Sequence, residues 1–157
     1  MDRAIVKSVT VPLPRAEAWR RWTTKEGLQT FFAPDCAIEL WPLTPFHIWF
    51  FPENPPGARG AEDLVLLSFL PERMLSFQWD APPHLPEVRA HKNWVVVQFD
   101  DAGEGTTTLT MHHHGWKDGP QWDQAFAYFT EAWEVVLGRF ARSVREGPLE
   151  GSFLGKD

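Results

Sequence analysis

The sequence has little of several features that mark particular protein classes. It contains a single cysteine, Cys36, which excludes an internal disulfide and a metal site built from several thiolates. It carries 15 basic against 21 acidic residues, for a formal net charge of -6, and has no dense basic run. Nucleic acid and anionic membranes are therefore not expected as partners.

Long hydrophobic runs are also lacking. No apolar stretch approaches the roughly 18 residues that a membrane-spanning helix needs. The N-terminal segment MDRAIVKSVTV alternates between apolar and polar residues and has no long apolar core, so we expect no signal peptide. The expected location is therefore the cytoplasm.

The motifs of the common enzyme classes are missing as well. The sequence has no serine nucleophile elbow, no phosphate-binding glycine loop and no dinucleotide fingerprint. Two acidic pairs, Glu62-Asp63 and Asp100-Asp101, fall in predicted turns, where solvated charge is the usual explanation. We therefore assign no catalytic residue and expect no cofactor.

Aromatic residues, in contrast, are abundant. They make up 14% of the chain, with nine tryptophans and twelve phenylalanines against one tyrosine. This is more than a core of this size requires. It favours either a cavity lined by aromatic rings or an exposed aromatic surface.

The longest regular pattern spans residues 118–147. Apolar residues recur there every three or four positions, which predicts one long amphipathic helix. Asp118 is placed to cap this helix, Pro120 fits its first turn, and Gly147 ends it. Its apolar stripe consists of Trp122, Phe126, Phe129, Trp133, Val136, Phe140 and Val144. Such a broad stripe needs an equally broad apolar partner surface.

Strand patterns fill most of the remaining chain. We expect seven strands, at residues 5–11, 36–41, 46–51, 63–70, 74–79, 93–100 and 106–114, and two short helices after the first strand, at residues 15–22 and 25–32. Alternation turns Leu75, Phe77, Trp79, Val95, Val97, Phe99, Leu109, Met111 and His113 toward one interior and leaves Trp94 and Val96 outside. The order predicts an α+β fold in which a curved antiparallel sheet receives the long helix on its concave face.

The domain organisation is expected to be simple. Residues 1–157 show no internal repeat and no linker between two cores, which indicates one domain. Residues 149–157 are expected to form a loosely ordered tail. The turn-rich segment 52–60 is either the rim of a pocket or a plain exposed loop, and residues 81–91 form a second proline-rich loop.

The three consecutive histidines suggest a metal site only at first sight. Adjacent strand residues point to opposite faces, so only His112 and His114 could share an ion, on the outer face. No local acidic residue or cysteine completes a ligand set, and we expect no functional metal. His113 faces inward, either as a hydrogen-bonded structural residue or as a group that contacts a ligand or transfers a proton.

Four segments together resemble a known family. They are residues 11–19 with Trp22, residues 71–79, residues 105–116 and residues 133–137. Their order and spacing resemble the START/Bet v 1-like (SRPBCC, birch-pollen-allergen) superfamily, and within it the homologues of the activator of the Hsp90 ATPase. One departure is Leu43-Thr44-Pro45, where relatives often carry two glycines before the third strand.

The resemblance implies a helix-grip fold with a cavity between the sheet and the long helix that binds a small hydrophobic molecule in many relatives. The expected lining is Phe77, Trp79, Val97, Phe99, Leu109, Met111, His113, Trp122, Phe126, Phe129 and Trp133. The same rings could instead pack as a filled core.

Two alternatives to ligand binding stay open. One is a co-chaperone-like module of the stress response that contacts a chaperone, and the other is a cyclase- or hydratase-like enzyme that uses the same cavity. The outward Trp94 and Val96 also leave a homodimer open.

Overall fold

The computed structural model describes residues 3–152 and confirms the predicted α+β, helix-grip architecture. The elements, in chain order, are β1 (Ile5–Val11), α1 (Arg15–Thr23), α2 (Lys25–Leu28), β2 (Asp35–Ile38), β3 (Phe46–Trp49), β4 (Gly60–Ala61), β5 (Leu66–Leu70), β6 (Met74–Trp79), α3 (Pro86–His91), β7 (Asn93–Asp101), β8 (Thr107–His114) and α4 (Pro120–Glu146). Two of them, β4 and α3, lie in segments that we expected to be loops.

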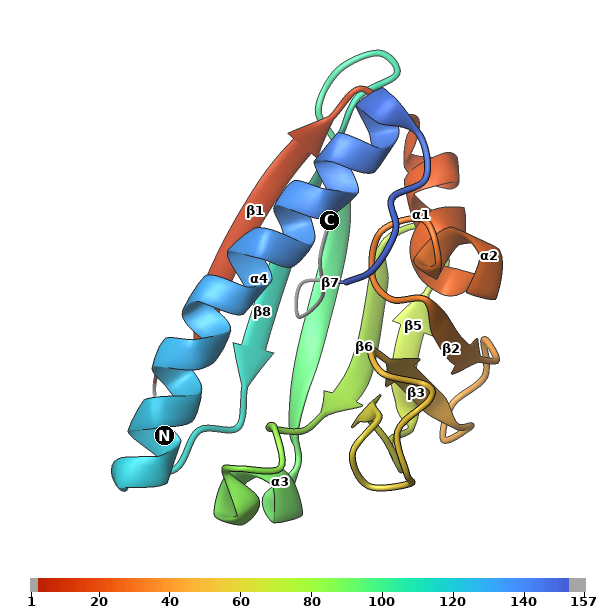
Figure 1. The fold of residues 1–157 in the computed structure, drawn as a ribbon. Helices are drawn as coiled ribbons and strands as arrows, with labels where there is room; N and C mark the ends of the chain where they lie inside the picture. Colours follow the sequence, from red (N-terminus) through yellow and green to blue (C-terminus); the bar gives the residue numbers. More distant parts are fainter. Residues whose placement is uncertain (1–2, 153–157) are drawn as a thin grey trace.

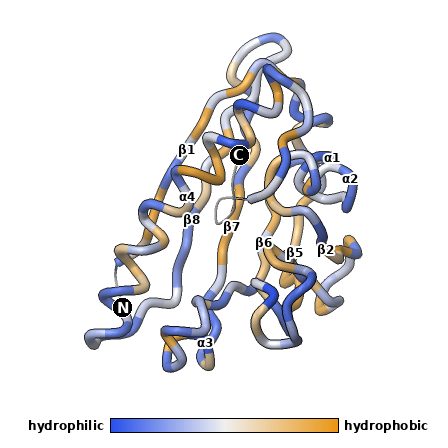
Figure 2. The backbone as a smooth tube through the Cα atoms, viewed as in Figure 1, coloured by the Kyte–Doolittle hydropathy of each residue, from blue (hydrophilic) through white to orange (hydrophobic). Residues whose placement is uncertain are grey.

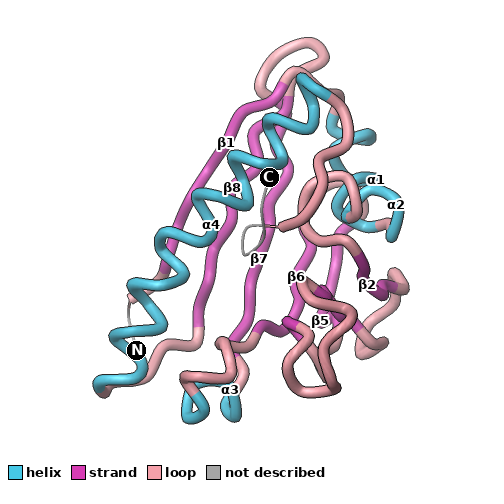
Figure 3. The backbone as a smooth tube through the Cα atoms, in the orientation of Figure 1, coloured by secondary structure: helices cyan, strands magenta, loops and turns pink. Residues whose placement is uncertain are grey.

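The strands form two antiparallel sheets. The larger has the order β1-β8-β7-β6-β5, and the smaller has the order β2-β3-β4 (Figure 1). The helix α4 lies along the larger sheet, across β1, β8 and β7, whereas α1, α2 and the small sheet stand beside β5 and β6. The long loops are concentrated around the small sheet and α3, at one end of the molecule (Figure 3).

The predicted inward faces of the central strands are confirmed. All nine side chains assigned to the interior of β6, β7 and β8 are buried, and Trp94 is 39% exposed on the other face. Along β7 the tube is largely hydrophobic, while the end of β8 that carries the histidines is hydrophilic (Figure 2). The alternation of side chains between the two faces of each strand therefore determines which residues face the interior under α4.

The long helix differs from its prediction at the N-terminus. Its N-cap is Gly119, with no side-chain cap hydrogen bond, so the assignment of Asp118 as the cap is wrong. Pro120 is the first helical residue, where its missing N–H costs nothing. At the other end Gly147 adopts φ 93°, and its N–H donates to the Ser143 carbonyl at 2.9 Å, so a glycine ends the helix as predicted.

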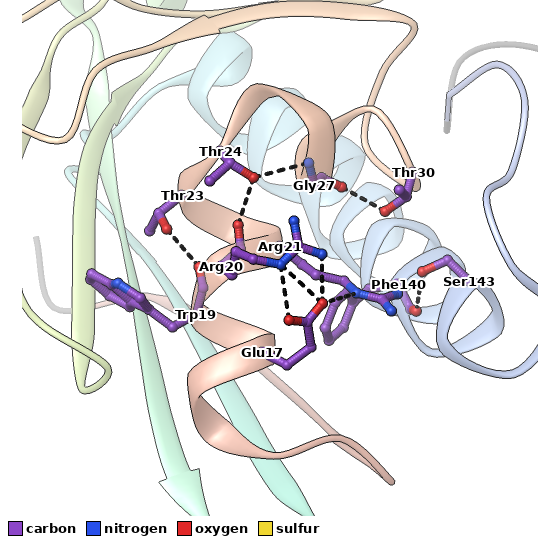
Figure 4. Close-up of polar contacts among 10 residues, drawn as sticks. All are labelled: Glu17, Trp19, Arg20, Arg21, Thr23, Thr24, Gly27, Thr30, Phe140 and Ser143. Atoms are coloured by element: carbon purple, nitrogen blue, oxygen red, sulfur yellow. Dashed lines mark hydrogen bonds and ion pairs between the residues drawn. The ribbon is translucent and has the colours of Figure 1, made fainter.

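The corner between α1 and α2 is held by local polar contacts (Figure 4). The Glu17 carboxylate accepts from Arg20 and Arg21 one turn later, and the Thr24 hydroxyl accepts from the Gly27 N–H at 3.0 Å. Thr24 thus caps α2, as the sequence predicted. A Cβ on Gly27 would lie 2.4 Å from the Arg21 Cα, so the two short helices approach too closely there for any side chain.

The segment after α4 is anchored over the part that the structure describes. The Leu149 N–H donates to the Thr30 carbonyl, and the buried Arg139 donates to the carbonyls of Phe31 and Glu150. Ser152 is buried. Residues 149–152 are thus anchored rather than loose, and the rest of the expected tail, residues 153–157, lies outside the described residues.

Candidate functional site

Most of the aromatic side chains that we expected around a cavity pack against one another. Phe77, Val97, Phe99, Leu109, Met111 and Trp122 are at most 1% exposed and belong to one continuous core. Phe126 is partly buried and meets the Trp116 ring and the Arg3 guanidinium. The middle of the sheet and α4 are therefore closed by side-chain packing.

His113 lies in this closed region and is completely buried. Its Nδ1 accepts a hydrogen bond from the Trp133 indole N–H at 2.9 Å, and its Nε2 is 2.8 Å from the Asn93 Oδ1. Because an indole N–H can only donate, the proton of the neutral imidazole is on Nε2 and is donated to Asn93. Burial, with His114 nearby, lowers the pKa of His113 to about 3. This arrangement describes a neutral histidine that joins β8, β7 and α4.

An open cavity of about 280 Å³ lies at the loop-rich end of the molecule. It is bordered by the end of β6 and the segment after it, the loop before β4, the helix α3 and the first half of α4. The lining residues are Phe50, Phe51, Ala58, Gly60, Ala61, Trp79, Asp80, Ala81, Pro82, Pro83, His84, Arg89, Tyr128 and Phe129. We call this cavity the aromatic pocket. Of the lining that the sequence predicted, Trp79 and Phe129 border it.

A narrow gap under α4, with no room for a water molecule, shares two lining residues with the aromatic pocket. It is bordered by Trp79, Phe129, Ala132, Trp133 and Val136. The Trp79 ring lines both spaces, and its buried Nε1 has no hydrogen-bond partner within residues 3–152. This indole N–H is enclosed by the surrounding side chains rather than open to the pocket.

Two charged lining residues of the aromatic pocket, Asp80 and Arg89, meet a third charged side chain, Glu62, which is not part of the lining. The Arg89 guanidinium lies 3.3 Å from the Asp80 Oδ2 and 3.4 Å from the Glu62 Oε2. It also donates to the main-chain carbonyls of Ala81, Gly57 and Gly60, at 2.6 to 3.2 Å. Arg89 thereby ties α3 to the segment after β6 and to the loop before β4, and both of these form the pocket wall.

Asp80 is the residue of this group whose ionisation is most altered. It is 8% exposed, and burial raises its pKa from an ordinary 3.8 to about 7, against the lowering effect of Arg89 and of the Glu62 backbone. Its carboxyl group can therefore exist in either protonation state near neutral pH. A carboxyl group of this kind in a cavity is a functional-site candidate.

Sequence reasoning missed this polar group. Asp80 directly precedes the predicted proline-rich loop 81–91 and Arg89 falls near its end, with no period or motif to single them out. Glu62 was expected to be solvated, and that expectation is wrong because the side chain is buried beside Arg89. The one available signal was the density of prolines and aromatic residues on both sides of Asp80. Segment 52–60 was left open as a pocket rim or an exposed loop, and it contributes Ala58 and Gly60 to the pocket.

The histidines on the outer face of β8 are arranged differently. The rings of His112 and His114 stack with centroids 6.1 Å apart, and the His112 Nε2 is 2.8 Å from the Gln98 Oε1. Within residues 3–152, no group of three histidine, cysteine or acidic side chains is placed to hold a metal ion.

In the range of residues 3–152, no helix combines the length and apolar character that membrane crossing requires.

Known structures share this fold. A protein from Mesorhizobium loti, MLL2253, superposes with a TM-score of 0.74 at 18% identity, over 94% of this chain and 100% of that one. CalU16 from Micromonospora echinospora gives a TM-score of 0.69 at 18% identity, over 94% of this chain and 77% of its own. The Aha1 dimer from Colwellia psychrerythraea gives 0.67 at 16% identity, over 92% and 98%. At these identities the likeness concerns the fold.

Sequence comparison identifies the family. A search among curated proteins found no match. A family model, described as "Activator of Hsp90 ATPase homolog 1-like protein", matches residues 12–145. Because this match covers most of the chain, the protein belongs to the family of activator of Hsp90 ATPase homolog 1-like proteins.

Proposed function

We propose that the protein binds a small, largely apolar ligand with an aromatic ring in the aromatic pocket. The observation that carries the proposal is an open cavity of about 280 Å³ whose walls include Phe50, Trp79, Tyr128 and Phe129, with Asp80 at one side. Small-molecule sites are typically apolar hollows with a few placed polar groups. A buried space of about 150 Å³ can hold benzene, so this one has room for two fused rings.

The chemistry of the wall supports binding of a ring. The aromatic side chains of Phe50, Trp79, Tyr128 and Phe129 offer faces and edges to a flat ligand, and stacked or edge-to-face pairs are favourable beyond simple burial.

Binding can be tested with a neutral probe, 2-naphthalenemethanol, by calorimetry or ligand-observed NMR. We expect saturable binding with a Kd on the order of 0.1 mM, which corresponds to an ordinary binding energy per atom for a small ligand. Ala58→Trp, at the exposed edge of the pocket, should weaken binding at least about tenfold because the indole takes up ligand space.

The matched control is Ala102→Trp, which places the same ring in the exposed turn between β7 and β8, away from the pocket lining. It should leave the Kd unchanged. Ala81→Leu, which enlarges a buried wall residue, gives a second test from inside the pocket. A wild-type protein that does not bind the probe, or binding that survives both filling variants, would contradict the proposal.

Family membership favours a second candidate, a co-chaperone-like module that acts in the cytoplasm on a heat-shock ATPase. The structure offers exposed apolar side chains for such a contact. Trp94 is 39% exposed on the outer face of β7, beside the half-buried Val96, and Trp41 and Leu43 are 66% and 71% exposed in the turn between β2 and β3. Stimulation of Hsp90 ATPase turnover by the wild-type protein, lost in Trp41→Ser or Trp94→Ser, would favour this candidate. No stimulation would argue against it.

A further inference from the structure

The charged group that borders the aromatic pocket holds more acidic than basic side chains. Asp80 and Glu62, both under 10% exposed, share the single guanidinium of Arg89. With both carboxylates ionised, this buried group carries one negative charge in excess. Buried charges are costly unless they are paired, so the group gains stability either by taking up a proton or by meeting a cation.

The cation already present is occupied by the protein itself. The Arg89 Nη1 donates to the Ala81 carbonyl and faces Asp80, while its Nη2 lies within 3.4 Å of the Gly57 and Gly60 carbonyls and of Glu62. Both terminal nitrogens are thus engaged inside the fold. Arg89 is therefore poorly placed to attract a ligand carboxylate, and the group as a whole attracts positive charge.

The remaining wall suits an organic cation. Aromatic faces attract positive charge through their quadrupole, most strongly where water is excluded, and Trp79, Phe50, Phe51, Tyr128 and Phe129 supply five rings around one space. A carboxylate beside several rings combines the two interactions that bind ammonium groups. A metal ion, in contrast, would find few oxygen ligands in such a wall.

From this juxtaposition we infer that the aromatic pocket selects ligands that carry a protonated amine on an apolar, ring-containing body. The amine pairs with the Asp80 carboxylate, and the body fills the space between Trp79 and Phe129. The inference rests on the proposed function, since it names the ligand class of the same pocket. The amine supplies the positive charge that the pair of carboxylates lacks.

Other charged groups near Asp80 set the pH range of this selectivity. Glu62 and Arg89 are its direct neighbours, Lys92 acts on it from the end of α3, and His84 lines the same pocket. Amine binding needs Asp80 ionised, so affinity should increase as pH rises through about 7. His84 is thus a second titratable side chain that faces a bound cation, and the variant below isolates the effect of Asp80.

Three probes with one ring system test the inference by calorimetry at pH 7.5: 2-naphthylmethylamine, 2-naphthalenemethanol and 2-naphthoate. We expect the amine to bind at least about tenfold more tightly than the alcohol, as a charge-assisted contact predicts, and the carboxylate to bind weakest. An alcohol or a carboxylate that binds as tightly as the amine overturns the inference while the proposed function stands. If no probe binds, both the inference and the proposed function are wrong.

Asp80→Asn keeps the shape of the side chain and removes its charge. We expect it to abolish the preference for the amine and its dependence on pH between 5.5 and 7.5, while the alcohol keeps its affinity. Glu53→Gln, in the same loop region but outside the pocket lining, removes an exposed charge and should change neither. An amine preference or a pH dependence that persists in Asp80→Asn would overturn the role of Asp80.

Discussion

The buried tryptophans show how a single hydrogen bond distinguishes otherwise similar residues. Trp133 and Trp22 are both 1% exposed and both pack among phenylalanine rings. The Trp133 indole N–H is bonded to His113, whereas the Trp22 Nε1 has no partner within residues 3–152. Replacing each ring by phenylalanine therefore removes comparable volume but leaves different polar groups behind.

We expect Trp133→Phe to lower the free energy of unfolding by about 1–3 kcal/mol more than Trp22→Phe does. The first change leaves the buried His113 Nδ1 without its donor, which costs a desolvation penalty, and the second removes an N–H that was already unpaired. Urea denaturation of the two variants measures the difference. Equal losses would mean that the bond to His113 contributes nothing net.

For single residues, the sequence predicted which side chains face the interior better than it predicted which of them have an altered pKa. The period of two along β8 placed His113 inside, where it is found. It did not place Asp80, because one acidic residue after a strand resembles any turn residue until α3 brings Arg89 beside it. A pKa depends on such long-range neighbours, and these are set by the tertiary structure.

Among the elements, α4 was predictable because its apolar period persists for 27 residues. The six residues of α3 and the two of β4 carry no comparable signal, and tertiary contacts determine them. On sequence grounds, a glycine at position 27 indicates no more than a weakened helix. The structure shows instead that this glycine allows α1 and α2 to approach each other closely.

Gly27→Ala should destabilise the protein by about 1–3 kcal/mol, the usual cost of forcing extra atoms into a packed site, because the new Cβ would meet the Arg21 backbone. The matched change is Gly138→Ala in the exposed middle of α4, where a Cβ meets nothing within 4 Å. That variant should gain about 0.5–1 kcal/mol from helix propensity. Thermal or chemical unfolding of both variants measures whether stability falls in the first and rises in the second. A change of the same sign in both variants would contradict the close approach of α1 and α2 at Gly27.

For the whole molecule, the order of elements was enough to predict the layers but not the position of the pocket. Alternating strands and one long helix dictate a sheet covered by a helix. The middle of that interface is filled, and the open space lies where irregular segments, α3 and the loop before β4, meet the end of β6. The conformations of these segments follow from contacts such as those of Arg89, which no local pattern encodes.

The acid stability of the whole molecule depends on two buried groups with opposite effects. The pKa of His113 is lowered by burial to about 3. Between pH 6.5 and 3 the unfolded chain therefore binds a proton that the folded protein does not bind, and the free energy of unfolding falls as pH falls. The pKa of Asp80 is raised by burial to about 7, so the folded protein binds a proton that the unfolded chain releases above pH 3.8. Its contribution is lost as pH rises. Between about pH 4.5 and 6.5 these slopes oppose each other.

We therefore expect wild-type stability to vary little between pH 4.5 and 6.5, and Asp80→Asn to lose stability on acidification by about 1.4 kcal/mol per pH unit more than the wild type, the free energy of one proton per unit. His112, whose pKa is lowered by partial burial, acts in the same direction as His113. The lowered pKa of Glu17, due mainly to its bond with Arg20, changes stability only below about pH 4.5.

Urea unfolding at pH 4.5, 5.5 and 6.5 measures how the stability of each protein changes with pH. The exposed Asp118→Asn is the control for loss of a charge. Parallel slopes for Asp80→Asn and the wild type would show that Asp80 stays ionised in the folded protein at these pH values, and the rise of amine affinity through about pH 7 would then be wrong.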